Sequence, residues 1–460
     1  MSAQAFDAIV VGAGQAGPSL AARLAVAGMK VALIERHHLG GTCVNTGCMP
    51  TKALVANAYA AHLARRAADY GVMIDAPIRI DFTRVMERAR TITSTARANL
   101  ESWIGGLENV TLIRGHARFE TPDTLRVGDA LFIAPRIFLN VGGRAAVPNM
   151  PGVRDVPFLT NTSLLALEEL PRHLIVVGGS YIGLEFAQII RRLGSEVTVV
   201  ERMSRIVARE DEEISEAIRT ILEAEGITIR TDAECISLVM HEGAPAIDVD
   251  CASGPPEIVG SHILLAVGRV PNTDDLDLDR AGVETDERGY IPVDEGLQTK
   301  VPGIWALGDC NRRGAFTHTS YNDFEIVAAN LIDGQNRSLT SRILAYALYI
   351  DPPLGRVGLS ETEARKSGRR LLVSKRPMTR VGRAIEKGET KGFIKVVADA
   401  ATQRILGAAI LGVGGDEAIH GILDIMNAGA SYPVLQWAVP IHPTVSELIP
   451  TVLGDLKPLH

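Results

Sequence analysis

Residues 6–36 read FDAIVVGAGQAGPSLAARLAVAGMKVALIER, and residues 173–202 read HLIVVGGSYIGLEFAQIIRRLGSEVTVVER. Each stretch has an apolar strand pattern, a glycine turn, a helix pattern, a further glycine, a second apolar strand and a terminal acid. The number of residues from the first glycine to the acid is the same in both copies. This order and spacing are the fingerprint of a βαβ unit that binds a dinucleotide. Two copies therefore predict two bound dinucleotides.

The glycines of the fingerprint have separate physical tasks. The first permits a tight turn after the strand, the second lets the backbone approach a pyrophosphate, and the third lets helix and strand pack closely. They are Gly12, Gly14 and Gly17 in the first copy, and Gly178, Ser180 and Gly183 in the second. The N-terminus of the helix then presents free N–H groups to phosphate. Because serine is small, we expect Ser180 to admit a pyrophosphate in a tighter space than glycine would.

The acid that ends each unit can accept hydrogen bonds from ribose hydroxyl groups. It is Glu35 in the first unit and Glu201 in the second. A flavin and a nicotinamide cofactor are the simplest pair of dinucleotides for such a chain. Glu201 would repel a 2′-phosphate, so NADH is expected in preference to NADPH. Arg202 and Arg205 lie close enough in sequence to accommodate that phosphate and keep NADPH open.

The length of 460 residues predicts two to four domains. A formal net charge of −7 argues against a nucleic-acid-binding surface, which requires clustered Lys and Arg. No apolar run is long enough for a membrane span, and the start of the chain has no signal-peptide pattern, so a cytoplasmic protein is expected. Five cysteines are too few and too scattered for a secreted disulfide framework.

The stretch GGTCVNTGCMPTKALV, residues 40–55, contains a closely spaced cysteine pair just after the first βαβ unit. Gly47 gives the backbone freedom to bring the sulfurs of Cys43 and Cys48 together. Pro50 suits the first turn of a helix, whose N-terminal dipole, with Lys52, would favour a thiolate on Cys48. The alternative is a metal site, but Cys235, Cys251 and Cys310 form no second ligand cluster. We therefore predict a redox-active dithiol and no metal site.

Taken together, these motifs resemble the class I flavoprotein disulfide reductases, the family of dihydrolipoamide dehydrogenase, glutathione reductase and mercuric reductase. The resemblance runs along essentially the whole chain and is carried by GAGQAG, GGTCVNTGCMPTK, GGSYIGLE, AVGRVPN, GIWALGDC and HPTVSE. It implies an FAD-dependent enzyme that uses NAD(P)H and works as a homodimer. The implied fold is α/β, with two Rossmann-like dinucleotide-binding domains and a C-terminal α+β dimerisation domain. The expected extents are an FAD domain with a helical insertion at 1–146, an NAD(P) domain at 147–270, a segment completing the FAD site at 271–338 and the dimerisation domain at 339–460.

The resemblance also assigns roles at the dithiol. Cys43 resembles the interchange thiol that meets substrate, and Cys48 the thiol beside the flavin. Lys52 and Glu185 resemble the ion pair next to the flavin ring. Tyr181 resembles the aromatic residue that covers the flavin until the nicotinamide displaces it.

Further cofactor contacts follow from the same motifs. Asp309 resembles the acid that binds the ribityl chain, and His116 and Ala117 resemble a loop that contacts adenine. A helix expected from about Tyr321 would point its N-terminus at the pyrimidine edge of the flavin. The remaining expected cofactor-binding positions are Gly41, Thr42, Gly143, Ile182 and Gly268.

His442 and Glu447, in IHPTVSELIP, resemble the family's acid–base dyad. The imidazole would exchange protons with the interchange thiol, and the carboxylate would orient the ring. In the family this dyad reaches the dithiol of the other subunit. His442 is thus expected to serve a partner's Cys43 and Cys48.

The substrate is less constrained by the sequence. The dyad favours a small-molecule disulfide or dithiol, as in dihydrolipoamide dehydrogenase. A mercuric-reductase-like metal-ion reductase is the first alternative, but residues 451–460 hold no cysteine pair and His442 stands where those enzymes usually carry Tyr. A docking subunit of a larger dehydrogenase complex is a second alternative, and a flavin oxidase that uses one cysteine is a third.

Overall fold

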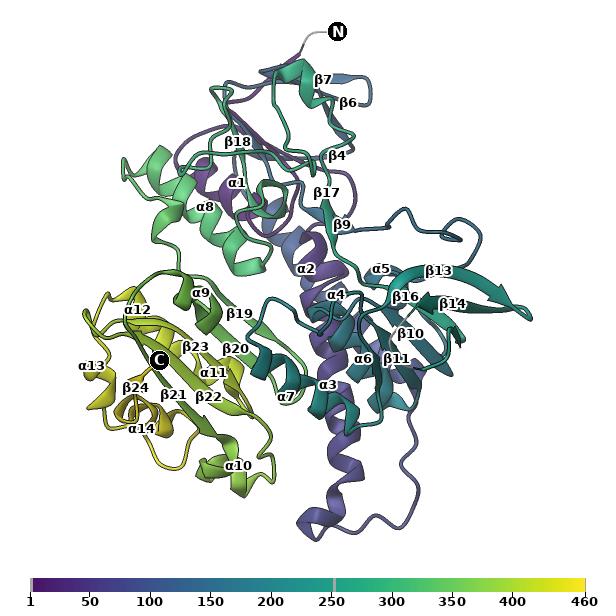
Figure 1. The fold of residues 1–460 in the computed structure, drawn as a ribbon. Helices are drawn as coiled ribbons and strands as arrows, with labels where there is room; N and C mark the ends of the chain where they lie inside the picture. The colour runs from purple at the N-terminus through teal and green to yellow at the C-terminus, as the bar shows by residue number, and fades with distance from the viewer. Residues whose placement is uncertain (1–2, 251–253, 460) are drawn as a thin grey trace.

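The first repeat folds into a five-stranded parallel sheet of order β18-β8-β2-β3-β4 (Figure 1). The computed structural model describes residues 3–250 and 254–459. The strands of this sheet are β2 (Ala8–Val11), β3 (Val31–Glu35), β4 (Val110–Arg114), β8 (Ile137–Leu139) and β18 (Ile304–Ala306). β2 and β8 are buried along their whole length, as expected for apolar runs inside a parallel sheet. The helices α1 (Gly17–Val26) and α8 (Thr317–Ile332) pack against each other beside it.

The second repeat forms a separate parallel sheet of order β12-β11-β10-β16. Its strands and helices are β10 (His173–Val177), α6 (Tyr181–Leu193), β11 (Glu196–Val200), α7 (Glu212–Glu223), β12 (Thr228–Arg230) and β16 (His262–Leu265). A three-stranded antiparallel sheet extends from this unit, with β13 (Glu234–His241), β14 (Ala244–Asp250) and β15 (Glu257–Val259). Cys251 lies outside the described residues, as does the side chain of Cys235.

The two fingerprints have matching backbone geometry. Gly12 and Gly178 have φ of +100° and +113°, a region that disfavours side chains. A Cβ on Gly17 would lie 2.1 Å from the carbonyl oxygen of Gly12, and a Cβ on Gly183 equally close to that of Gly178. The first and third glycines are therefore required by the turn and by close packing in both units.

A long helical hairpin follows the cysteine pair. The Ala-rich stretch expected to be helical forms α3 (Cys48–Arg65), a 3₁₀ turn at Ala67–Tyr70 and α4 (Phe82–Gly105). Asp81 caps α4 by accepting a hydrogen bond from the backbone N–H of Arg84 at 3.0 Å. Ala53, Leu54 and Ala58 of α3 belong to the same buried cluster as Leu184 of α6. The hairpin thus ties the first repeat to the second.

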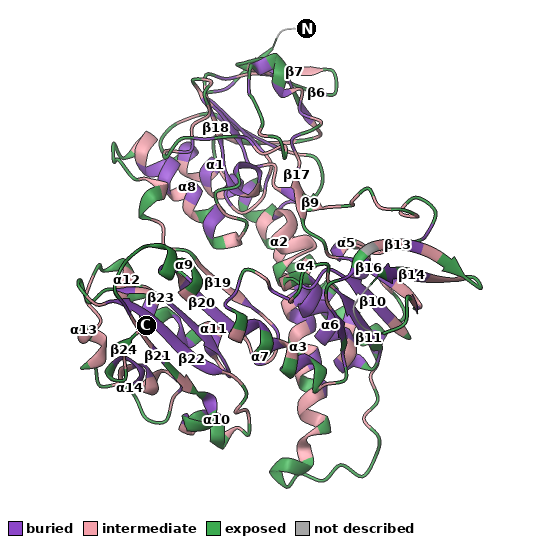
Figure 2. Ribbon diagram, in the orientation of Figure 1, coloured by how far each residue is buried: buried purple, intermediate pink, exposed green. Residues whose placement is uncertain are grey.

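The C-terminal part is a six-stranded antiparallel sheet of order β19-β20-β23-β22-β21-β24. Its strands are β19 (Ala345–Leu348), β20 (Leu354–Gly358), β21 (Leu371–Pro377), β22 (Phe393–Asp399), β23 (Ile405–Leu411) and β24 (Lys457–Pro458). Short helices surround it, namely α9 (Glu361–Lys366), α10 (Gly382–Glu386), α11 (Gly415–Ala418), α12 (His420–Asn427), α13 (Pro433–Gln436) and α14 (Ile449–Gly454). Figure 2 shows that its central strands are buried while much of the helical surface is exposed.

Smaller elements complete the chain. A mixed sheet beside the first repeat contains β1 (Gln4–Ala5), β5 (Ala117–Thr121), β6 (Thr124–Val127) and β7 (Ala130–Ile133). The ribbon of β9 (Gly143–Ala145) and β17 (Arg269–Pro271) lies where the chain passes between the two repeats.

The predicted fold class, two dinucleotide-binding units and a C-terminal α+β domain, is confirmed. No helix among the described residues is both long and apolar enough to cross a membrane.

Candidate active site

The cysteine pair lies where a short helix meets a long one. Cys43 belongs to α2 (Gly41–Asn45), and Cys48 begins α3. A Cβ on Gly47, between them, would lie 2.8 Å from the carbonyl oxygen of Thr42, so the turn requires glycine. Both thiols are free in this structure, Cys43 half-buried and Cys48 exposed, and they hydrogen-bond to each other. Asn161 Nδ2 donates to the carbonyl oxygen of Thr46 at 2.7 Å and fixes the loop.

The two thiols differ in acidity. The hydrogen bond from Cys43 lowers the pKa of Cys48 to about 6, and Thr317 and Lys52 act in the same direction. Thr317 Oγ1 lies 3.4 Å from Cys48 Sγ. The bond to Cys48 and burial both raise the pKa of Cys43. The reduced pair therefore carries its negative charge on Cys48 and its proton on Cys43.

Lys52 and Glu185 form an ion pair beside the dithiol. Lys52 Nζ lies 2.7 Å from Glu185 Oε2, and the Glu185 carboxylate is almost fully buried. Glu185 Oε1 accepts a hydrogen bond from the backbone N–H of Tyr349 at 2.9 Å. The Lys52 ammonium also lies 4.5 Å from the centre of the Tyr349 ring. Helices α3 and α6 and the chain after β19 thus meet at one charged pair.

The first fingerprint presents the groups that FAD would need. Glu35 accepts hydrogen bonds from the backbone N–H groups of Ala13 at 2.8 Å and His37 at 2.7 Å. Among the described residues, no acceptor pairs with the backbone N–H groups of Gly14 or Gln15 at the start of α1. Free N–H groups at a helix N-terminus fit a pyrophosphate.

The far end of that site holds a carboxylate, Asp309, that has no side-chain hydrogen-bond partner among the described residues. Burial raises the pKa of Asp309, whose nearest cation is Arg269, with Nε 3.7 Å from Oδ2. Within the described residues no side-chain hydrogen bond reaches this carboxylate, which fits a ligand rich in hydroxyl groups. Arg269 also donates to the carbonyl oxygen of Gly143, to which Thr42 Oγ1 donates at 3.4 Å. The residues present therefore fit FAD.

Other expected contacts lie at the edge of this site. His116 Nε2 lies 2.8 Å from the carbonyl oxygen of Asp275, and Ala117 begins β5. Gly41 has φ of +58°, and a Cβ there would lie 2.8 Å from Gly14 Cα. The tight contact between Gly41 and Gly14 brings the cysteine loop against the fingerprint turn.

The second fingerprint repeats the arrangement. Glu201 accepts hydrogen bonds from the backbone N–H groups of Gly179 at 2.6 Å and Met203 at 2.8 Å. Ser180 precedes α6, whose first-turn residue Ile182 is exposed. Gly268, with φ of +132°, lies just before the β17 strand. These groups fit the adenosine half of a nicotinamide dinucleotide.

Tyr181 begins α6 and is held at its hydroxyl group. That hydroxyl donates to Glu210 Oε1 at 2.9 Å. Tyr346 of β19 donates to the same oxygen at 2.5 Å, and the two tyrosine rings lie 5.5 Å apart. No feature of the sequence indicated Glu210 or Tyr346.

His442 and Glu447 form an exposed dyad in the C-terminal part of the chain. His442 Nδ1 lies 2.8 Å from Glu447 Oε2, while the imidazole is 80% exposed. Within one chain's described residues, neither side chain hydrogen-bonds to a cysteine. The preceding apolar residues Trp437, Val439 and Ile441 are 78%, 96% and 79% exposed. Such an exposed apolar segment is typical of a protein–protein interface.

Asn140 is a further residue of the site that sequence reasoning missed. Its Oδ1 accepts the backbone N–H of Gly17 at 3.0 Å, and its Nδ2 donates to the carbonyl oxygen of Leu307 at 3.0 Å. A Cβ on Gly14 would lie 2.8 Å from that Oδ1, which is a second reason for glycine there. A buried Asn ending an apolar strand was the available signal.

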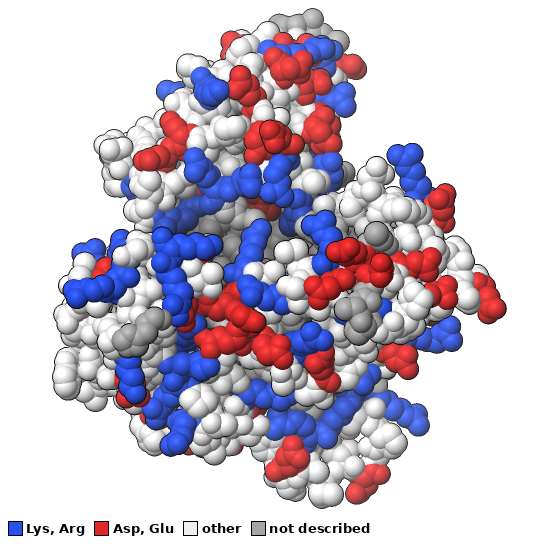
Figure 3. All heavy atoms as spheres, in the orientation of Figure 1, with Lys and Arg blue, Asp and Glu red and all other residues white. Residues whose placement is uncertain are grey.

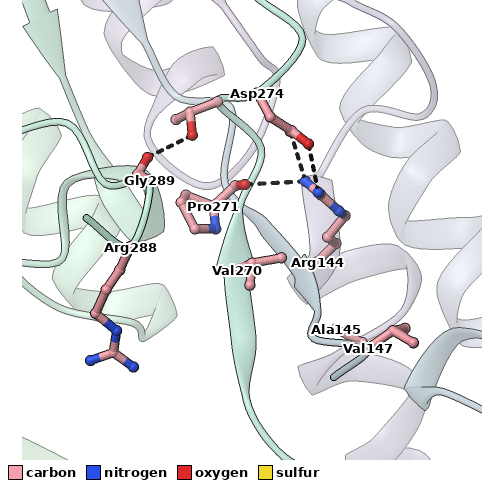
Figure 4. Close-up of a pocket in the computed structure, with 9 residues that line it drawn as sticks. Arg144, Ala145, Val147, Val270, Pro271, Asp274, Arg288 and Gly289 are labelled. Atoms are coloured by element: carbon pink, nitrogen blue, oxygen red, sulfur yellow. Dashed lines mark hydrogen bonds and ion pairs between the residues drawn. The ribbon is translucent and has the colours of Figure 1, made fainter. Parts of the chain in front are cut away.

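The surface around the candidate site carries basic side chains and a cavity. Figure 3 shows Lys and Arg side chains across the middle of this face. They surround the hollow where the first repeat, at the top of the view, meets the second repeat and the C-terminal sheet below it (Figure 1, Figure 3). A cavity of about 390 Å³ lies on the β9–β17 ribbon (Figure 4), and neither Cys43 nor Cys48 lines it. There Arg144 is engaged by Asp274, with Nη–Oδ distances of 3.0 and 2.8 Å. The described residues contain no cluster of three or more His, Cys, Asp or Glu able to hold a metal ion.

This fold and site define a flavin-dependent dithiol enzyme, and the comparison with known families agrees. Residues 6–323 match the model of pyridine nucleotide-disulphide oxidoreductases, and residues 344–453 match the dimerisation domain of the same family. The chain belongs to the pyridine nucleotide-disulphide oxidoreductase family, an FAD-dependent enzyme class that uses NAD(P)H.

Three relatives show the range of the family. A probable pyridine nucleotide-disulfide oxidoreductase, RclA of Escherichia coli, is 36% identical over 98% of this chain and 99% of its own. Dihydrolipoyl dehydrogenase of Thermus scotoductus is 34% identical over 96% of this chain and 95% of its own. Mercuric reductase of Streptomyces lividans is 33% identical over 95% of this chain and 93% of its own. A solved Cu(II) complex of RclA, described as an HOCl-induced flavoprotein disulfide reductase, superposes with a TM-score of 0.89 at 34% identity over 99% of both chains.

Proposed function

We propose that this enzyme passes electrons between NAD(P)H and a small-molecule disulfide or dithiol through Cys43 and Cys48. The observation that carries the proposal is the setting of Cys48, which begins α3 and has its Sγ 3.4 Å from the Thr317 hydroxyl oxygen. With the nearby Lys52 ammonium, this setting favours the negative charge of the reduced pair on Cys48 and the proton on Cys43. A thiol that keeps its proton needs a base before it can attack a disulfide. The sequence provides one in the exposed dyad of His442 and Glu447.

FAD, when bound, supplies the ability to accept a hydride from the nicotinamide and to deliver an electron pair to the Cys43–Cys48 disulfide. The groups that would hold it are the free N–H groups of Gly14 and Gln15, the Glu35 carboxylate and the Asp309 carboxylate. The Lys52 ammonium provides a fixed positive charge near Cys48, and Glu185 orients it. This charge stabilises the Cys48 thiolate.

The exchange steps follow from the chain's own groups. His442 of the partner subunit removes the proton of Cys43, and Glu447 holds the imidazole in position. The Cys43 thiolate attacks one sulfur of the substrate disulfide, that S–S bond breaks, and the leaving thiolate takes the proton. The Cys48 thiolate then attacks the Cys43 sulfur and releases the second thiolate of the substrate. Two electrons have left the protein, and its internal disulfide has formed.

The substrate class proposed first is a disulfide of the lipoamide type, because the dyad has a use only where protons accompany thiol exchange. A thiophilic metal ion is the second candidate. It is favoured by the Cu(II) complex solved for the similar RclA, and by two adjacent sulfurs, one of them exposed. A mercuric-reductase-like activity would fall in this second class, although residues 451–460 contain no cysteine.

The test is a substrate screen with the purified protein and its Cys43→Ser and Cys48→Ser variants. NADH oxidation is measured with lipoamide, glutathione disulfide, mercuric ion, cupric ion, quinones and oxygen. The proposal expects flavin to co-purify and a disulfide to be reduced only when both cysteines are present. Disulfide reduction that survives in Cys43→Ser would refute it. Full turnover by a free dimer would argue against a docking subunit.

A further inference from the structure

A buried carboxylate connects the start of α6 to the C-terminal sheet. Glu210 is 2% exposed and stands just before α7. Its Oε1 accepts hydrogen bonds from the hydroxyl groups of Tyr181 at 2.9 Å and Tyr346 at 2.5 Å. Because Tyr181 belongs to the second repeat and Tyr346 to β19, one oxygen atom holds two parts of the chain together.

The charge around Glu210 makes these two bonds strong. Arg356, 3% exposed, places Nη1 3.9 Å from Glu210 Oε2 and provides a buried positive charge opposite this carboxylate. Neither Glu210 Oε2 nor Arg356 Nη2 has a hydrogen-bond partner within the described part of the chain. A buried carboxylate with so few donors binds each of them firmly, because a charged acceptor forms stronger hydrogen bonds than a neutral one. Burial and the Glu210 charge also raise the pKa of Tyr181, so its hydroxyl stays a donor.

Aromatic rings support the same tyrosine from the side. The Tyr346 ring lies 5.5 Å from that of Tyr181 and stacks at 5.6 Å on Phe316, the residue that precedes α8. The next residue, Thr317, contacts Cys48. Tyr181 is thus held at its hydroxyl group by Glu210 and at the side of its ring by Tyr346, which in turn stacks on Phe316.

We propose that Glu210, supported by Tyr346, latches Tyr181 in the position seen here, and that a nicotinamide must release this latch to reach the flavin. The inference rests on the proposed function, and on the role that the family resemblance gives Tyr181, which is to cover the flavin until the nicotinamide displaces it. Glu210 and Tyr346 are then positioning residues. They set the fraction of molecules that are open to the nicotinamide and leave the reacting atoms untouched.

The direction in which NAD⁺ affinity changes follows from the equilibrium between molecules with Tyr181 latched and molecules with Tyr181 released. The apparent dissociation constant of a ligand equals its intrinsic constant divided by the fraction of competent molecules. Weakening the latch raises that fraction and must tighten binding. Loss of one charge-assisted hydrogen bond should tighten NAD⁺ binding by roughly tenfold or more.

The experiment measures NAD⁺ binding to the oxidised, FAD-containing dimer by titration calorimetry, with the KM for NADH and kcat alongside. Tyr181→Phe and Glu210→Gln should bind NAD⁺ more tightly and show a lower KM with kcat changed less. Tyr346→Phe should move the same way by a smaller factor. Tyr59→Phe is the matched control, because it removes a tyrosine-to-glutamate hydrogen bond of 2.7 Å to Glu389, away from Tyr181, and should leave binding unchanged.

The outcomes separate this inference from the proposed function. Binding of NAD⁺ that is unchanged or weaker in Tyr181→Phe, in an enzyme still reduced by NADH, overturns the latch and leaves the proposed function standing. A wild-type protein that binds FAD but neither NAD⁺ nor NADH overturns both. Glu210→Gln removes the charge opposite Arg356, so the two tyrosine variants, which keep that pair, decide the question when Glu210→Gln does not fold.

Discussion

Thr317 Oγ1 lies 3.4 Å from Cys48 Sγ, so the first residue of α8 contacts the first residue of α3. When Cys48 is a thiolate, only the Thr317 hydroxyl can donate in this contact. Both residues also stand at helix N-termini, where the backbone dipole favours negative charge. Two helices from distant parts of the sequence thus stabilise one sulfur anion.

Replacing Thr317 by Val should raise the pKa of Cys48 from about 6. Above that pKa Cys48 is a thiolate and reacts with iodoacetamide, and as the pH falls through it the thiol is protonated and the reaction slows. One hydrogen bond of roughly 1 kcal/mol corresponds to a rise of about 0.7 pH units. The measurement is the pH dependence of Cys48 alkylation in the reduced protein, followed by peptide mass spectrometry. Thr317→Ser should keep the wild-type midpoint, and an unchanged midpoint in Thr317→Val would contradict the assignment.

Replacing Lys52 by Met should destabilise the protein and raise the pKa of Cys48 together. Glu185 is buried and would lose its cation, which costs roughly 1–3 kcal/mol for a pair whose lysine is partly exposed. Urea unfolding measures the first effect and alkylation of Cys48 the second. Lys300→Met is the control, since Lys300 and Glu284 form an exposed pair, and it should change neither quantity. Equal stability of Lys52→Met and the wild type would show that the ion pair is not structural.

Much of the fold was predictable because its signals are local. The glycine spacing, the apolar strands and the acids at strand ends lie within two short stretches, and Glu35 and Glu201 occupy the same geometry in the structure. The conformation of the cysteine loop was equally predictable, because Gly47 is required by a contact with Thr42, only a few residues away.

The parts that sequence reasoning missed are contacts between distant segments. The helix expected from about Tyr321 begins at Thr317 instead, because Thr319 Oγ1 accepts the backbone N–H of Phe316 and closes the first turn earlier. Glu210 lies within the acidic stretch 210–213, and only the fold brings its carboxylate to the hydroxyl groups of Tyr181 and Tyr346. Substrate choice escapes the sequence for the same reason, since it depends on the surface around an exposed thiol.

Mixing two inactive subunits should restore activity if His442 serves the partner's dithiol. His442→Ala should lower disulfide exchange by roughly 10²- to 10⁴-fold, the usual contribution of a general acid–base group. Cys43→Ser should be inactive as well. A mixed dimer has one site with both cysteines and His442, so random exchange of subunits should recover about one quarter of wild-type activity. Refolding the two variants together and assaying the mixture tests this, and recovery near zero would place the dyad in its own chain's site or outside catalysis.

Glu201 should set the choice between NADH and NADPH. Both of its oxygens accept backbone N–H groups, from Gly179 and Met203, so the negative charge is fixed at the end of β11. A 2′-phosphate at this strand end would meet that charge at a cost of roughly 1 kcal/mol or more at a partly exposed site. Arg202 is exposed next to it and could contact the phosphate once the carboxylate is gone.

Wild-type enzyme should therefore have a higher kcat/KM for NADH, and Glu201→Ala should shift the ratio toward NADPH by about tenfold. Adding Arg202→Ala to that variant should cancel the gain, because the remaining cation, Arg205, donates to the carbonyl oxygens of Ala208 and Glu210 at 3.3 Å. Steady-state kinetics with both cofactors at fixed ionic strength give the comparison. A wild-type preference for NADPH would mean that the Glu201 charge is outweighed by its cationic neighbours, and the arginine variant would then lose that preference.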